Sequence, residues 1–162
     1  MPLRTHRPAG LSDQHDVPVV VSLFHSHHAV AYAARRWARI VAAVRLLSED
    51  PRTLEGWSRA VGVSRGALKM WCQVAGVTAK DSLDLARLLR GAAFSHERPR
   101  NPFDVFDIVD PRTFTRLLIR ADISAMPRLP PPLALLTAQK LVTEPLLLDA
   151  LRDALTENAS TE

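Results

Sequence analysis

The sequence predicts an all-α fold that contains a helix-turn-helix unit followed by additional C-terminal helices. Apolar residues recur at helical spacing along most of the chain, and the predicted helices begin at capping residues and end at glycine or proline. Three of these helices follow one another within residues 53–94, separated by turns of only a few residues. No segment alternates in the manner of a strand, apart from a faint possibility at residues 17–24.

The N-terminal part divides into a lead-in and a long helix. Residues 1–16 carry prolines, a glycine and polar residues without apolar periodicity, which predicts a flexible segment. An amphipathic helix is expected over residues 29–47, and Pro51 stops it because proline disfavours helix at the residue before it. Its apolar face consists of Val30, Ala33, Ala34, Trp37, Ile40, Val41, Val44 and Leu47.

Three capped helices are expected next. Thr53 can cap the first, residues 54–61, which Gly62 ends. Ser64 can cap the second, residues 65–75, which ends at Gly76. Thr78 can cap the third, residues 79–94, with Asp81 three residues further on in an approximate capping box.

The remaining helices are predicted in a C-terminal region over residues 103–157. A polar, proline-bearing link at residues 95–102 precedes it, and helices are expected at residues 113–121, 133–142 and 145–155. Residues 127–132, PRLPPP, cannot continue a helix. The chain is therefore divided into a lead-in at 1–16, a helix-turn-helix domain at 29–94 and this C-terminal region.

A short phrase occurs twice, 60 residues apart. Residues 50–54 read DPRTL and residues 110–114 read DPRTF, each with the form of a turn, a cap and a helix start. Either the phrase arose twice by chance, or the chain holds two related helical units. In the second unit Asp122 stands where the first has Gly62, and Pro127 interrupts the helix that would follow, so a second helix-turn-helix would be degenerate.

Charge is distributed unevenly along the chain. The formal net charge is +4, but residues 1–100 hold 15 basic and 8 acidic residues, whereas residues 101–162 hold 6 basic and 9 acidic residues. A basic front half suits a polyanionic partner, although solvated helix faces would give the same distribution. The single cysteine, Cys72, excludes an internal disulfide and favours a cytoplasmic location, and no secretory signal or membrane span is predicted.

Residues 53–75 meet the geometric needs of a helix-turn-helix. Two short helices must cross steeply through a turn in which glycine takes a left-handed conformation, and Gly62 is placed for this. Trp57, Val61, Leu68 and Trp71 are expected to face inward, with Val63 at the corner and Ser58 where the helices approach. Ser64 would cap the second helix and leave its first backbone amides free to meet phosphate.

The outward side of the second helix carries side chains that suit base edges and phosphates. Arginine and lysine recognise guanine or phosphate, glutamine pairs with adenine, and glycine permits close approach to the groove. Between residues 53 and 80 the only acidic residue is Glu55. Met70 fits a contact to a thymine methyl group, and equally the edge of the core. The outward set is Arg65, Gly66, Lys69, Met70 and Gln73.

The segment over residues 37–93 resembles the DNA-binding region of AraC/XylS-type bacterial transcription regulators. The resemblance rests on the phrases RIVAAVRLL, TLEGWSRAVGVSRGALKMWCQVAG and VTAKDSLDLARLLRGA. Residues 76–78, GVT, and 86–88, ARL, stand where the family begins its linking helix and carries its Arg-Leu pattern; the family's usual small alanine is Ser58 here. The resemblance implies a homeodomain-like, AraC-type domain in which Arg65, Gly66, Lys69, Met70 and Gln73 read bases.

Other chemistries find little support in the sequence. His25 and His28 lie one helical turn apart, but no cysteine or carboxylate nearby completes a metal-ligand set. Cys72 has no histidine near it in sequence, and Asp104, Asp107 and Asp110 are read as a solvated edge. We therefore expect no catalytic residue, no metal and no cofactor, and no enzyme activity.

The expected partner is double-stranded DNA, read by the second helix of the motif in the major groove. Arg36, Arg39 and Arg52 are candidates for gripping phosphates on either side. A single motif gives limited affinity, so a homodimer or a partner regulator is expected. The alternative is a helical adaptor that keeps the packing of the motif and uses its surface for protein contacts.

Overall fold

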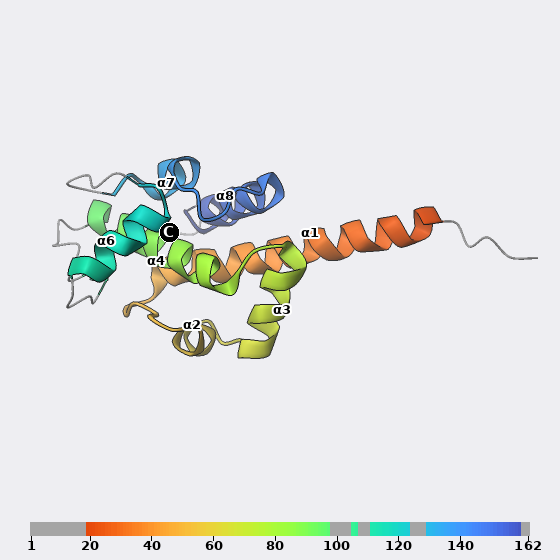
Figure 1. Cartoon of the computed structure of the whole chain (residues 1–162), viewed down its shortest axis with the longest axis horizontal. Helices are drawn as coiled ribbons and strands as arrows, with labels where there is room; N and C mark the ends of the chain where they lie inside the picture. Colours follow the sequence, from red (N-terminus) through yellow and green to blue (C-terminus); the bar gives the residue numbers. More distant parts are fainter. Residues whose placement is uncertain (1–18, 98–104, 107–110, 124–128, 160–162) are drawn as a thin grey trace, which may run out of the picture.

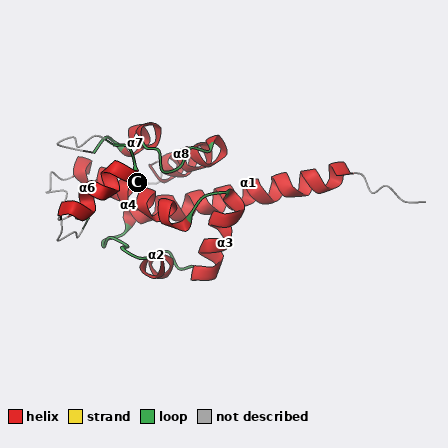
Figure 2. Cartoon of the chain, in the orientation of Figure 1, coloured by secondary structure: helices red, strands yellow, loops and turns green. Residues whose placement is uncertain are grey.

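The computed structural model describes residues 19–97, 105–106, 111–123 and 129–159, and its regular elements are helices throughout (Figure 2). The all-α prediction is therefore confirmed for these residues. The predicted lead-in at residues 1–16 lies outside them, and so do residues 98–102 of the predicted link. The helices are α1 (Val19–Ala43), the 3₁₀ helix η1 (Val44–Leu46), α2 (Leu54–Ala60), α3 (Arg65–Ala75), α4 (Ala79–Glu97), α6 (Pro111–Arg120), α7 (Pro132–Ala138) and α8 (Pro145–Ala159).

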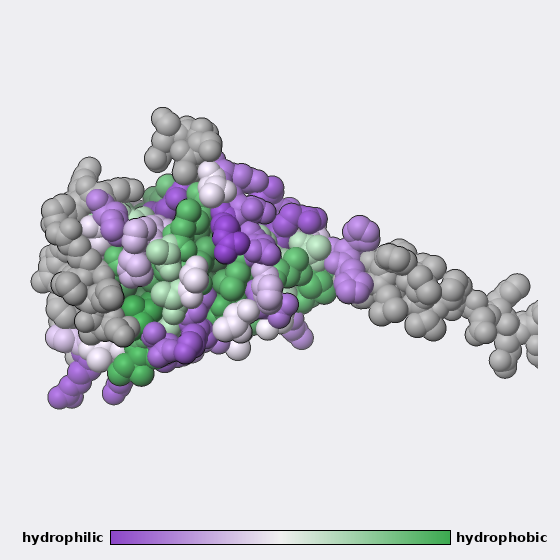
Figure 3. Space-filling model, turned by 90° about the horizontal axis from the view of Figure 1, so that it is seen from above, coloured by the Kyte–Doolittle hydropathy of each residue, from purple (hydrophilic) through white to green (hydrophobic). Residues whose placement is uncertain are grey.

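The long helix α1 is the axis of the molecule. In Figure 1, α2 and α3 lie on one side of α1 while α7 and α8 lie on the opposite side, and the first turns of α1 project beyond the other helices. Helix α1 contacts α3, α4 and α8. Viewed from the side of α7 and α8, hydrophobic residues are interspersed with hydrophilic ones on the surface (Figure 3). Helices α2 and α3 therefore lie across α1 from the C-terminal helices α7 and α8.

Helix α4 forms the centre of the core. All of its residues from 82 to 93 are buried. One cluster of buried apolar side chains joins it to the other helices, including the C-terminal ones. The largest fully buried members are Trp37, Trp57, Leu68, Leu85, Leu88, Leu89, Phe106, Leu135, Leu147 and Leu151. Residues 34–155 thus contribute to one hydrophobic core.

Two arginines of α4 are buried as well, which helical periodicity alone does not predict. The Arg87 guanidinium donates to both carboxylate oxygens of Asp50: Nε lies 3.2 Å from Oδ1 and 2.9 Å from Oδ2, and Nη2 lies 2.6 Å from Oδ2. Arg90 donates to the carbonyl oxygens of Leu47 at 2.9 Å and Ser48 at 2.6 Å. Both side chains hold the segment between η1 and α2 against α4, so they position the start of α2 relative to α4.

The N-terminal helix is longer than predicted. It begins at Val19, ten residues before the predicted start at residue 29, so the possibility of a strand at residues 17–24 is wrong for residues 19–24. The valines of this stretch are compatible with a helix because β-branched residues lower helix propensity only slightly. At its other end α1 tightens into η1, which closes at Leu47 through a bond from its backbone N–H to Val44 O.

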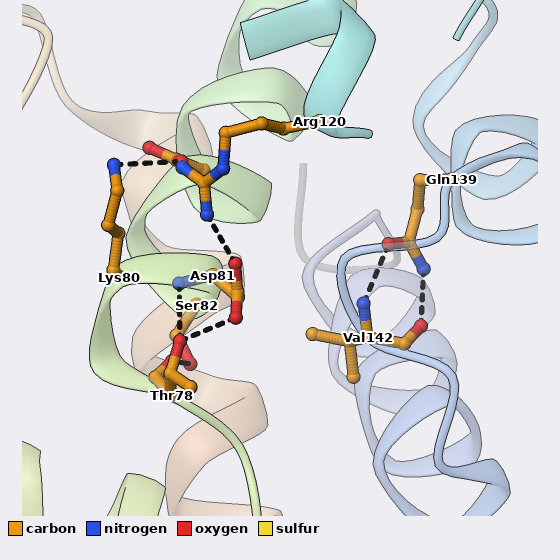
Figure 4. Close-up of polar contacts among 8 residues, drawn as sticks. Thr78, Lys80, Asp81, Ser82, Arg120, Gln139 and Val142 are labelled. Carbon is orange, nitrogen blue, oxygen red and sulfur yellow. Dashed lines mark hydrogen bonds and ion pairs between the residues drawn. The ribbon is translucent and has the colours of Figure 1, made fainter. Parts of the chain in front are cut away.

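Helix α7 ends at Ala138, four residues before the predicted end. Gln139 adopts an extended conformation, with φ −79° and ψ 156°, and its side chain is buried. Its Nε2 donates to Val142 O at 2.7 Å, and Val142 N donates to its Oε1 at 3.0 Å (Figure 4). The side chain thus satisfies backbone groups that a continuing helix would otherwise have paired, and the turn into α8 follows.

The two copies of the repeated phrase form different helix starts and the same helix end. Thr53 caps α2, whereas α6 begins at Pro111 and contains Thr113, so the expected cap at Thr113 is wrong. The chain leaves both helices alike: Val63 N donates to Ser58 O at 3.0 Å, and Ile123 N donates to Leu118 O at 3.0 Å.

Within that shared turn, Gly62 has φ 71° and Asp122 has φ 55°. Asp122 is the one non-glycine residue with positive φ in the described part of the chain, a conformation that aspartate tolerates better than most residues. Its carboxylate pairs with Lys140, whose pKa is raised by this hydrogen bond and charge. The backbone of the second copy therefore repeats the first as far as the turn, and residues 124–128, which follow it, lie outside the described residues.

Ion pairs connect helix α6 to helix α4. Arg120 pairs with Asp81 and Asp84, and Lys80 Nζ lies 3.5 Å from Asp84 Oδ2 (Figure 4). Asp81 N also donates to Thr78 Oγ1 at 3.0 Å, which caps α4 at the predicted residue. Asp84 itself is buried, so these cations compensate the cost of holding its charge away from water.

Candidate nucleic-acid interface

Two short helices and a sharp turn form the region in which the sequence placed the functional residues. Gly56 N donates to Thr53 Oγ1 at 3.0 Å at the start of α2, and Ala67 N donates to Ser64 Oγ at 3.1 Å at the start of α3. Between them the chain reverses at Gly62, where the left-handed backbone would strain any other side chain although the space beside it is open. The turn sets the direction in which the chain leaves α2 and enters α3.

The residues on the inner side of the two helices are mostly apolar and pack in the core. Trp57 is fully buried, and Leu68 and Cys72 of α3 lie in the core with Ala75. Ser58 is buried as well and donates from Oγ to Glu55 O at 3.0 Å. Half-buried residues that pack on this core from the turn and from α3 are Val61, Val63 and Trp71.

The five predicted base-reading residues all lie on the exposed side of α3. Arg65, Gly66, Lys69, Met70 and Gln73 are each exposed to solvent. The sequence-based prediction did not include a sixth exposed residue on this side, Val74, which follows Met70 after one helical turn and is 41% exposed. Within the described residues neither cation of this face forms an ion pair with a carboxylate, and Glu55, the acidic residue of α2, is paired with Arg59 at 2.8 Å. The face therefore combines two positive charges, an amide and apolar side chains.

Gly66 leaves a gap in this surface close to the beginning of α3. A methyl group at its Cα would lie 4.0 Å from Ser64 Oγ, its nearest neighbour. Neither packing nor positive φ requires glycine here, and glycine weakens a helix relative to alanine. What glycine provides at this position is access to the backbone.

Two of the three predicted phosphate-gripping arginines lie together beside the turn. Arg36 and Arg39 of α1 line a cavity of about 210 Å³ with residues of the turn and of α3, including Val63 and Trp71. Arg36 stacks over the Trp71 ring at 5.7 Å, and its Nε donates to Tyr32 Oη at 2.9 Å. The guanidinium is thus held at the flank of α3. Helical spacing within α1 does not predict this contact with α3.

The third arginine, Arg52, belongs to a different place. It lines a cavity of about 330 Å³ that precedes α2, together with Glu49, Asp50 and Arg59. Two acidic residues and one further arginine line it with Arg52, whereas the flank formed by Arg36 and Arg39 is otherwise lined by apolar residues. The structure therefore groups the predicted cations into two sets.

The described residues also bear on metal binding and on nucleophilic chemistry. In the stretches that the structure describes, no three histidine, cysteine or acidic residues gather as a metal site would need. Burial raises the pKa of the Cys72 thiol, while its hydrogen bond with Ser82 acts in the opposite direction. A buried, protonated thiol is a poor nucleophile. Among the same residues, no helix has both the length and the apolar character to cross a membrane.

Comparison with known proteins gave no match. Neither a protein-family model, nor a curated protein, nor a solved structure matches the chain. The functional assignment therefore rests on the residues of α3 and their surroundings.

Proposed function

We propose that the protein binds double-stranded DNA in a sequence-specific manner and regulates transcription, with α2 and α3 acting as a helix-turn-helix of the AraC type. The observation that carries the proposal is the exposed side of α3, where Arg65, Lys69 and Gln73 stand free of acidic partners in the described structure. An α-helix fits the major groove, and these three side-chain types recognise guanine, phosphate and adenine there.

The surroundings of α3 supply the backbone contacts that such a helix needs. Arg36 and Arg39 lie at one flank of α3 beside the turn. Phosphate contacts from flanking elements fix the register of a reading helix without carrying sequence information. Arg52 lines a different cavity, together with Glu49, and is a weaker candidate for such a contact. A homodimer or a partner regulator would add the affinity that one motif lacks.

Binding to genomic fragments across a salt series tests the proposal. Four cations, Arg36, Arg39, Arg65 and Lys69, predict a slope of log K against log salt of about −3 to −4, because each neutralised phosphate contributes about −0.9. Fragments recovered at the highest salt should share a sequence element. A flat salt response, or recovery of fragments without a common element, would falsify sequence-specific DNA binding.

A protein-binding adaptor is the second candidate, and the exposed apolar side chains of Met70 and Val74 favour it. In that case a pull-down should recover a defined protein partner while genomic DNA is not enriched. Alanine at Met70 should then weaken the capture of that partner.

Replacing Gly66 with alanine should separate stability from binding. The methyl group enters open space on a helix, so the free energy of unfolding should stay the same or rise by up to about 1 kcal/mol. DNA affinity should nevertheless fall about tenfold, comparable to one mismatched base pair, because the helix end can no longer approach the groove. Thermal melting and fluorescence anisotropy measure the two quantities.

Gly56→Ala is the matched control, since it adds a methyl group to α2 rather than to the exposed side of α3. Its Cβ would lie 3.2 Å from Thr53 Oγ1, so a small stability change is expected with unchanged affinity. Equal DNA binding by the parent protein and Gly66→Ala would remove Gly66 from the interface.

A further inference from the structure

The exposed side of α3 consists of two parallel strips of different chemistry. Arg65, Lys69 and Gln73 follow one another at intervals of four residues and form a polar strip. Gly66, Met70 and Val74 follow the same interval one position later and form an apolar strip. Residues four apart lie on neighbouring turns of a helix, so each strip runs along the helix axis beside the other.

The apolar strip is not explained by the packing of the protein. Met70 is 51% exposed and Val74 is 41% exposed, and neither belongs to the core cluster. The side of α3 that does pack carries Leu68, Cys72 and Ala75. The methionine and valine side chains therefore remain available to a ligand that lies against α3.

The major groove of DNA offers one apolar feature to such side chains. Guanine, adenine and cytosine present hydrogen-bonding groups there, whereas thymine adds its C5-methyl group. The polar strip beside Met70 and Val74 suits the purine edges in the same groove. A ligand that presents methyl groups next to purine edges is duplex DNA with A·T pairs.

We propose, on the basis of the proposed function, that Met70 and Val74 determine specificity by contacting thymine C5-methyl groups while Lys69 and Gln73 contact purines. Four residues advance an α-helix by about 6 Å, and successive bases of one strand are about 3.4 Å apart along the axis. The two side chains therefore reach thymines in neighbouring or next-but-one base pairs. The ligand of α3 is then a short element that contains two such thymines.

A protein partner fits the strip less well. A specific protein interface buries about 800 Å² on each side, and charged residues are depleted at its centre. Here two apolar side chains lie directly beside the two cations Arg65 and Lys69. The charge beside the strip favours DNA, and a protein partner is one of the outcomes of the test.

Substitution of single thymines by deoxyuridine tests the proposal with the full chain. Deoxyuridine removes the C5-methyl group and keeps every hydrogen-bonding group of the base. In a duplex selected by the parent protein, we expect two positions at which the change lowers affinity about threefold to tenfold, because each loses the burial of one methyl group. The loss should vanish at one position in Met70→Ala and at the other in Val74→Ala.

The outcomes distinguish this inference from the proposed function. Specific DNA binding that is indifferent to deoxyuridine at every position overturns the thymine contacts and leaves DNA binding intact. Absence of duplex binding by the parent protein overturns both. Capture of a protein partner that depends on Met70 and Val74, without any deoxyuridine effect, assigns the strip to that partner instead. Both variants change exposed side chains, and thermal melting verifies that they remain folded.

Discussion

Replacing Asp50 with alanine is expected to destabilise the protein by about 3–5 kcal/mol, because it leaves a buried guanidinium without its counter-charge. Asp50 is 8% exposed and Arg87 is likewise 8% exposed, so water reaches neither group well. Three hydrogen bonds join the guanidinium to both oxygens of this carboxylate, and the shortest runs from Arg87 Nη2 to Oδ2 at 2.6 Å. Urea denaturation at neutral pH measures the loss as a shift in midpoint.

The neighbouring residue provides a matched control. Glu49 is exposed, and Glu49→Ala removes an acidic group one position away without uncovering a buried cation. Its effect should stay within about 0.5 kcal/mol. In the double variant Asp50→Ala/Arg87→Leu the unpaired charge is gone, so much of the lost stability should return. An Asp50→Ala protein that unfolds at the same urea concentration as Glu49→Ala would show that the pair is not buried.

The same pair shows where prediction from the sequence reached its limit. The bounds of α3 were predicted to the residue, because Ser64 and Gly76 are local signals that act on the backbone beside them. The burial of Arg87 depends on a carboxylate 37 residues earlier in the chain. Helical spacing assigns such an arginine to the surface, and only the tertiary arrangement places Asp50 against it.

A similar division holds for the candidate interface. The outward side of α3 follows from its helical period once Leu68 is placed in the core, so five exposed residues could be predicted in advance. Val74 was missed because valine in a periodic helix is normally assigned to the core. The stacking of Arg36 on Trp71 joins α1 to α3, and no local pattern encodes that contact. The predicted link between the chain and the AraC/XylS family remains a prediction.

In the repeated phrase, local sequence signals predicted some backbone features of the second copy wrongly. The phrase itself predicted the wrong helix start at Thr113, since α6 begins two residues earlier at Pro111. Proline is favoured at the first position of a helix, where its missing N–H leaves no bond unmade. The sequence alone did not predict that the turn recurs at Asp122, because aspartate only occasionally adopts a left-handed backbone conformation. The shift of 60 residues already aligns residues 62 and 122, but only the matching backbone bonds show that the turn is the same.

Reversing both charges of α3, in Arg65→Glu/Lys69→Glu, is expected to lower DNA affinity at least a hundredfold, since loss of one base-reading arginine alone costs about 1–3 kcal/mol. Each substitution also brings a negative charge against phosphate, and the salt slope should become shallower by about 2. Both side chains are exposed, so no packing is lost. A glutamate at position 65 lies in the first turn of α3, where the helix dipole stabilises negative charge. Weaker binding would therefore not come from unfolding.

The control must change the net charge equally and lie away from α3. Lys140→Glu/Arg152→Glu meets both conditions: Arg152 belongs to α8, on the opposite side of α1 from α3 (Figure 1), and Lys140 lies in the turn that follows α7. If the exposed side of α3 meets the DNA, this variant should bind within about threefold of the parent, because at physiological salt charges more than about 8 Å apart are largely screened. Fluorescence anisotropy with the selected duplex compares the two variants at one salt concentration. An equal loss of affinity in both variants would mean that DNA binding depends only on the net charge of the protein. Unchanged affinity in the α3 variant would show that this helix is not part of the interface.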